Sequence, residues 1–120
     1  MATKVISQEA VDQFHNDGYY LYNHPLFPDA TFRRLVDIFE ELLAAKGDKR
    51  GDQLDTPHFS DHRLLEFLMD DHVLDLVEDV IGPDIGLWAS HFISKEAGIG
   101  RATPWHSDAG YWKGRFDKFT

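Results

Sequence analysis

The sequence predicts an α+β fold in which helices come first and a sheet begins near residue 85. Apolar residues repeat with helical spacing as far as Ile81. Gly82-Pro83 then ends the pattern, because glycine is favoured just past a helix and proline directly after it. Residues 85–94 differ, since apolar side chains occupy both odd and even positions, as in a strand buried on both faces. We therefore expect helices packed against a sheet rather than helices alternating with strands.

The first helix is predicted between Ser7 and Gly18. Ser7 is a typical N-cap residue, and glycine is the residue that most readily ends a helix in the left-handed conformation. The aromatic run Tyr19-Tyr20-Leu21-Tyr22 that follows predicts a short strand. The inward residues of this helix are expected to be Ala10, Val11 and Phe14.

The second helix, over about residues 30–45, has the clearest amphipathic pattern in the chain. Asp29 is its expected cap, and Gly47 marks its end. Its apolar residues have the i, i+3, i+4, i+7 spacing of a single helix face, which we expect to pack against a sheet. This face consists of Phe32, Leu35, Val36, Phe39, Leu42 and Leu43.

A loop and two short helices are predicted next. Residues 46–55 are charged, contain two glycines and have no periodicity, so this segment is the expected loop. Asp61 and Asp71 are the expected caps of the two helices. The inward residues would be Leu64, Leu65 and Leu68 in one, and Val73, Leu74, Val77, Val80 and Ile81 in the other.

The composition excludes several classes of function. The chain has 120 residues, enough for one domain with a core, and no cysteine, which excludes disulfides, cysteine zinc sites and thiol nucleophiles. A net charge of −9 argues against a nucleic-acid partner. No apolar run reaches the ~20 residues of a membrane span, and no signal-peptide pattern follows Met1. We therefore expect a cytoplasmic protein with neither a nucleic acid nor a membrane as partner.

The stretch from Thr103 to Trp112 is the most informative for function. On an extended backbone residues i and i+2 point to the same side, so the side chains of His106 and Asp108 would project together. An imidazole and a carboxylate placed in this way supply two ligands of the 2-His-1-carboxylate site of non-haem Fe(II) oxygenases. His15-Asn16-Asp17 has the same spacing, but it lies in a predicted helix, where residues i and i+2 diverge. The candidate metal pair is therefore His106 and Asp108.

Several other residues have a structural alternative to a functional role. His58 and His62 have the spacing of a helical zinc pair, but Pro57 places His58 at the helix start, which favours a solvated helix terminus. His91 is a further candidate ligand, although a lone histidine on an apolar strand is usually a hydrogen-bonded core residue. The aromatic side chains assigned to the core are Trp88 and Phe92.

The order of these features resembles the phytanoyl-CoA dioxygenase family of Fe(II)- and 2-oxoglutarate-dependent oxygenases. The resemblance covers roughly residues 5–115 and is most specific at Lys95 and at Trp105-His106-Ser107-Asp108, with Tyr111 close behind. It implies that His106 and Asp108 bind iron and that Lys95 lies near the active site, where it would bind the co-substrate 2-oxoglutarate. The alternative for Lys95 is a surface residue at the end of a strand. Because Trp105 and Tyr111 flank the metal pair, we assign them to the substrate site, with core packing as the alternative.

The resemblance also implies a fold and a reaction. The fold would be a double-stranded β-helix, of the jelly-roll or cupin type, with helices packed against its major sheet. The reaction would use O2 and 2-oxoglutarate to hydroxylate a small-molecule substrate. An alternative function is a non-catalytic, β-rich binding or interaction module in which the His-x-Asp pair is structural.

The family's third iron ligand and its 2-oxoglutarate-binding arginine lie far downstream of the His-x-Asp pair. Neither is expected before Thr120, and an eight-stranded barrel needs on the order of 80–90 residues, whereas 36 follow Asp84. We therefore expect residues 1–120 to be the N-terminal portion of a single oxygenase domain, with helices over residues 7–82 and the β-helix starting at about residue 85. This portion alone is expected to be inactive.

Overall fold

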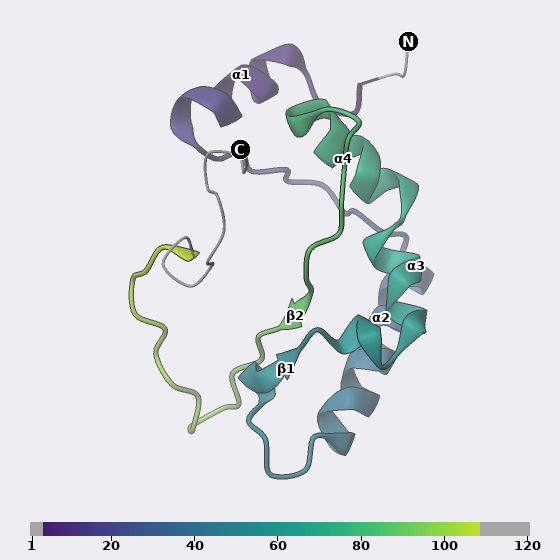
Figure 1. Ribbon diagram of the computed structural model, residues 1–120, viewed down its shortest axis with the longest axis vertical. Coiled ribbons are helices and arrows are strands. Elements are labelled where there is room, and N and C mark those ends of the chain that lie inside the picture. Colours follow the sequence, from purple (N-terminus) through teal and green to yellow (C-terminus); the bar gives the residue numbers. More distant parts are fainter. Residues whose placement is uncertain (1–3, 109–120) are drawn as a thin grey trace.

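The computed structural model describes residues 4–108 of the chain. Figure 1 shows α4, α3 and α2 along one side of the molecule, α1 beside α4 at one end, and the strands between these helices and the segment after β2. Helices with a small antiparallel sheet are compatible with the predicted α+β class. The elements are α1 (Gln8–Asp17), α2 (Asp29–Ala45), β1 (Leu54–Asp55), α3 (Leu65–Leu68), α4 (Asp71–Ile81) and β2 (His91–Phe92), with 3₁₀ turns at Gly51–Gln53, Pro57–Phe59 and His62–Leu64.

The boundaries of α1 agree with the prediction. The Ser7 hydroxyl oxygen accepts a hydrogen bond from the Ala10 backbone N–H at 3.2 Å. Gly18 has φ 80°, and its N–H donates to the carbonyl oxygen of Phe14 at 2.8 Å. Glycine is suited to this left-handed position because it has no Cβ to clash with the backbone.

The caps of the later helices are shifted by one residue in two cases. Asp61 accepts from a backbone N–H two residues on (3.1 Å), as predicted. However, Asp70 rather than Asp71 caps α4, because Asp70 has the extended conformation that lets a side chain reach back to the helix. Asp29 is likewise the first residue of α2 and not its cap. Gly82 ends α4 with φ 84°, as expected.

One apolar cluster joins α1 to α4. Next to it, the carboxylate oxygen Oδ2 of Asp79 accepts hydrogen bonds from the backbone N–H groups of Val5 and Ile6, at 2.6 and 3.0 Å. These bonds join the segment before α1 to α4, although most of the sequence separates them. The cluster consists of the buried Ile6, Ala10 and Val11, with the partly buried Tyr22, Leu76 and Val80 packed against them.

A second apolar cluster joins α2 to α3 and β2. Phe67 is 4% exposed, and its ring meets that of Phe27 edge-on with centroids 5.8 Å apart. Phe39 contacts Phe92 of β2 with ring centroids 5.1 Å apart. The buried members are Ile38, Leu64 and Phe67, and the partly buried members are Phe27, Leu35, Leu42, Leu68 and Phe92. This cluster holds the helices against the sheet.

The buried side of α2 differs from the predicted face. Ile38, outside that face, is the buried residue of the helix, whereas Phe32 is 54% and Val36 37% exposed. The apolar side of α2 is wider than the surface that α3 and β2 cover. A periodic pattern identifies an apolar side, but the partners decide which part of it is buried. The expectation that Phe32 packs against a sheet is therefore wrong.

The sheet is smaller than predicted and pairs two segments far apart in sequence. β1 and β2 are antiparallel, with Leu54 opposite Phe92 and Asp55 opposite His91. β1 lies in the segment that was predicted to be a loop, so that prediction is wrong at its last two residues. Two-residue strands have little pattern of their own, and their pairing is what defines them.

The predicted strand over residues 85–94 is reduced to β2. Residues 85–90 have no strand structure, and Leu87 and Ile93 are 40% and 66% exposed, so burial on both faces is contradicted. Trp88 is 71% exposed and does not belong to the core, whereas Phe92 does. The predicted strand at Tyr19–Tyr22 is also wrong, because that run joins no sheet within residues 4–108. Also within this part of the chain, no helix has the length and apolar character needed to cross a membrane.

Replacing Phe67 with Ala is expected to lower the free energy of unfolding by about 3–5 kcal/mol, because it leaves a cavity in the second cluster. Phe32 to Ala is the matched control, and its half-exposed ring should cost less than about 1 kcal/mol. Urea denaturation of both variants measures the difference. Equal losses would contradict the observed orientation of α2.

Replacing Asp79 with Ala is expected to cost about 1–3 kcal/mol, because two backbone N–H groups lose a charged acceptor. Asp79 to Asn should cost less, since its amide oxygen still accepts. Asp75, exposed on the same helix, provides the control, and its replacement by Ala should change stability by no more than about 0.5 kcal/mol. If both Ala variants unfolded at the same urea concentration, the two bonds would not hold the α1 segment.

Candidate functional site

The side chains of His106 and Asp108 converge, as their spacing predicts. Nε2 of His106 lies 3.3 Å from Oδ1 of Asp108. On the other side of the ring, Nδ1 lies 2.8 Å from the carbonyl oxygen of Pro104. Both side chains are substantially exposed, at 39% and 66%. The pair is therefore formed locally and faces outward from the described part of the molecule.

The Pro104 carbonyl determines the tautomer of His106. A carbonyl oxygen only accepts hydrogen bonds, so Nδ1 must carry the proton that it donates. In the neutral ring Nε2 then has a lone pair directed toward a carboxylate oxygen. Two acceptors at 3.3 Å repel each other unless a proton or a cation lies between them. Metal-binding histidines typically have this arrangement, with the second nitrogen donating to a backbone carbonyl.

The donor set fits two positions of a divalent metal. Two ligand atoms at right angles, each ~2.1 Å from an ion, are roughly 3.0 Å apart. The observed separation of 3.3 Å between Nε2 and Oδ1 is close to this value. Imidazole nitrogen with carboxylate oxygen suits Fe(II) among the first-row metals. Within residues 4–108, no group of three or more potential ligand side chains is found.

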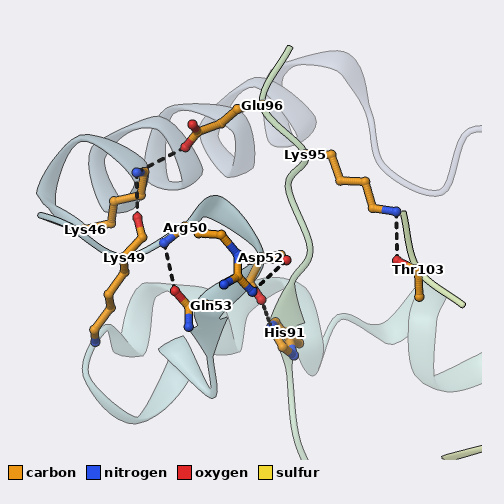
Figure 2. A network of polar contacts seen from close by, with 9 residues as sticks. All are labelled: Lys46, Lys49, Arg50, Asp52, Gln53, His91, Lys95, Glu96 and Thr103. Atoms are coloured by element: carbon orange, nitrogen blue, oxygen red, sulfur yellow. Dashed lines mark hydrogen bonds and ion pairs between the residues drawn. The ribbon is translucent and has the colours of Figure 1, made fainter. Parts of the chain in front are cut away.

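Lys95 lies close in space to the segment that precedes the pair. Its ammonium group donates a hydrogen bond to the Thr103 hydroxyl at 2.7 Å. Figure 2 shows this bond, which joins the chain after β2 to the segment that contains Thr103. An ammonium group has three donors, so this bond leaves donors for an anionic ligand.

A polar network lies beside Lys95, at the end of α2. Lys46 forms an ion pair with Glu96 (3.1 Å), and Arg50 forms one with Asp52 (2.8 Å) (Figure 2). The side-chain hydrogen bond from Arg50 holds the pKa of Asp52 below its ordinary value, and the charges of Arg50 and Arg101 lower this pKa further. Asp52 is therefore fixed as a carboxylate next to several cations.

His58 and His62, which have the spacing of a zinc-binding pair on a helix, do not form a metal pair. His58 is 5% exposed, and its Nδ1 lies 2.5 Å from the Ser90 hydroxyl, so the expected solvated helix terminus is wrong for this residue. His62 is exposed and belongs to the next 3₁₀ turn. His91 is hydrogen-bonded as expected, with Nε2 3.0 Å from the Asp52 carbonyl, but it is exposed rather than in the core.

Of the two aromatic residues assigned to substrate, the structure describes Trp105. Trp105 is fully exposed, and Tyr111 lies outside the described residues. A separate apolar cavity of about 320 Å³ lies between the second cluster and β2. Its walls are formed by Phe27, Leu35, Pro57, Leu64, Phe67, Leu68, Val73, Ser90, His91 and Phe92.

Comparison with known families assigns the chain. The model of the phytanoyl-CoA dioxygenase family matches residues 2–120, which is nearly the whole sequence. The chain belongs to the phytanoyl-CoA dioxygenase family. Members of this family are generally oxygenases that depend on Fe(II) and 2-oxoglutarate. No curated protein and no solved structure shows significant similarity to the chain.

Within this family member, some contacts around the site were not predicted from sequence. Thr103 joins the polar network through Lys95, across the loop between them, and Lys46 pairs with Glu96, which is distant along the chain. The Pro104 carbonyl oxygen contacts Nδ1 of His106, and the proline two residues before this histidine was the indication available in the sequence. The other contacts have no local sequence pattern, because each is created by the fold.

Replacing Arg50 with Met is expected to raise the pKa of Asp52 toward its ordinary value, because the strongest hydrogen-bond donor to the carboxylate is lost. Arg101 to Met should raise it less, since Arg101 acts through charge alone. The measurement is an NMR titration of the Asp52 side-chain carboxyl carbon. Arg33 to Met, on the exposed side of α2, is the control, and an unchanged titration in the Arg50 variant would contradict the contact.

Proposed function

We propose that the chain belongs to an Fe(II)- and 2-oxoglutarate-dependent dioxygenase that hydroxylates a small-molecule substrate, with His106 and Asp108 as two of three iron ligands. The supporting observation is the pairing of Nε2 with Oδ1 at 3.3 Å, with Nδ1 bound to the Pro104 carbonyl. Membership of the phytanoyl-CoA dioxygenase family supports the same chemistry. The third ligand is proposed to come from a histidine outside residues 4–108.

Iron bound at this pair would supply the activation of O2 that is coupled to decarboxylation of 2-oxoglutarate. The protein's own groups have other tasks. The Pro104 carbonyl, bound to Nδ1 of His106, would hold the ring so that Nε2 can bind the metal. Asp108 would supply an anionic oxygen that neutralises part of the ion's charge.

Three further residues are proposed to contact the small molecules. Lys95 would bind 2-oxoglutarate, since its ammonium group has donors beyond the one used by Thr103. Trp105 and Tyr111 flank the metal pair in sequence and are proposed to contact substrate. Trp105 is fully exposed, so its ring is accessible to a ligand.

The finer fold belongs to the same proposal. We propose that β1 and β2 belong to a double-stranded β-helix whose helices include α2 and α3 on one face. The packing of Phe92 against the second cluster, next to Ile93, which is 66% exposed, supports a sheet with one face covered by helices. Residues 1–120 would then be the N-terminal portion of a single oxygenase domain.

His106 to Ala is expected to abolish iron-dependent conversion of 2-oxoglutarate to succinate in the full-length protein, because one of three ligands is lost. Asp108 to Ala should have the same effect, since no anionic ligand remains. His15 to Ala is the control: His15 has the same spacing to an aspartate but lies in α1, and activity should persist. The measurement is succinate formation with added Fe(II), together with Mn(II) binding.

Two outcomes would contradict this proposal. Equal activity in the His15 and His106 variants would remove the pair from the site, and metal bound at His58 and His62 would place the site elsewhere. A full-length protein that binds no metal and forms no succinate would instead favour the non-catalytic binding module.

A further inference from the structure

The seven residues after Lys95 form a loop, here called the glycine loop (residues 96–102), that leads from β2 toward the His-x-Asp pair. The loop turns back on itself, because the Gly100 N–H donates to the Glu96 carbonyl oxygen at 2.9 Å and Gly98 has φ 79°. Its residues other than Glu96 are exposed. Contacts at its two ends therefore determine where the following segment lies.

The first end of the glycine loop is fixed to the end of α2. The Ser94 N–H donates to the Gly51 carbonyl oxygen at 3.3 Å, and Glu96 pairs with Lys46 at 3.1 Å (Figure 2). Gly51 is buried, and a Cβ at this position would come within 3.0 Å of the Ser94 carbonyl oxygen. The close approach of the two backbones therefore favours glycine at position 51.

At the second end of the glycine loop, a hydrogen bond joins Thr103 to Lys95. The Lys95 ammonium donates to the Thr103 hydroxyl at 2.7 Å and so joins the residues on either side of the loop. Thr103 is followed directly by Pro104, whose φ is restricted by its ring. The Pro104 carbonyl in turn accepts the hydrogen bond from His106 Nδ1. A continuous set of contacts thus leads from α2 to the imidazole.

We propose that Thr103 is a positioning residue, and that its bond to Lys95 sets the place of the His106 and Asp108 side chains relative to the sheet. This inference rests on the proposed function, because it concerns the metal affinity of that pair. Exposed side chains such as these must otherwise be ordered when the ion binds, which weakens affinity. The Lys95–Thr103 bond supplies part of this order in advance.

The experiment measures Mn(II) affinity of the full-length protein by EPR, without O2 or turnover. Thr103 to Val removes the hydroxyl at nearly constant shape and should weaken Mn(II) binding roughly three- to tenfold. Thr103 to Ser keeps the hydroxyl and should restore the parent affinity. Thr31 to Val, in the first turn of α2, is the matched control and should leave binding unchanged.

A double-mutant cycle tests whether Thr103 acts through Lys95. Lys95 to Met should weaken Mn(II) binding about as much as Thr103 to Val, and the double variant should lose no more than either single variant. Lys4 to Met, at a surface contact with Gln8, is the control for loss of a lysine charge. Additive losses, or parent affinity in the Thr103 to Val variant, would overturn the inference.

The two proposals fail in distinguishable ways. If the parent binds Mn(II), His106 to Ala abolishes binding and Thr103 to Val does not weaken it, the inference fails while the proposed function stands. If Lys95 to Met raises only the KM for 2-oxoglutarate, Lys95 acts on the co-substrate alone and the positioning role is overturned. If the parent shows no His106-dependent Mn(II) binding, both proposals are overturned.

Discussion

The packing of the partly buried Phe92 is the constraint that joins the helices to the sheet. Its ring lies against Phe39 and the second cluster, and its backbone pairs with Leu54. Because successive side chains of a strand point to opposite faces, a one-residue slip would turn Phe92 out of the cluster and expose its ring to water. The same contact therefore joins the helices to the sheet.

Features that depend on neighbours in sequence were predicted well. The Ser7 cap, the Asp61 cap and the glycine at position 82 each satisfy or end a helix through backbone groups only a few residues away. The one-residue shift from Asp71 to Asp70 shows the limit of this reasoning, since two adjacent carboxylates have the same chemistry. Backbone conformation selects between them, and the sequence does not specify it to one residue.

Features that depend on distant partners were predicted poorly. Phe32 and Ile38 both fit an apolar side of α2, but the position of α3 and β2 buries Ile38 and leaves Phe32 half exposed. Trp88 is large and apolar, yet no described element packs over it enough to bury it. β1 was not predicted because a strand of two residues is too short to show an alternating pattern. The periodicity of a sequence indicates which residues favour burial, whereas their actual burial depends on which elements pack against them.

The candidate site combines both kinds of information. Convergence of His106 and Asp108 requires only a local backbone geometry, so their spacing was sufficient to predict it. The contacts that we propose to place that pair are the bond of Lys95 to Thr103 across the glycine loop and the ion pair of Lys46 with Glu96, which joins the end of α2 to a distant part of the chain. A metal site needs ligand positions held to within a fraction of an ångström, and support for the ligands is as necessary as the ligands themselves. The convergence of the two side chains was therefore predictable from a short motif, whereas the contacts that support the pair depend on the fold of the chain.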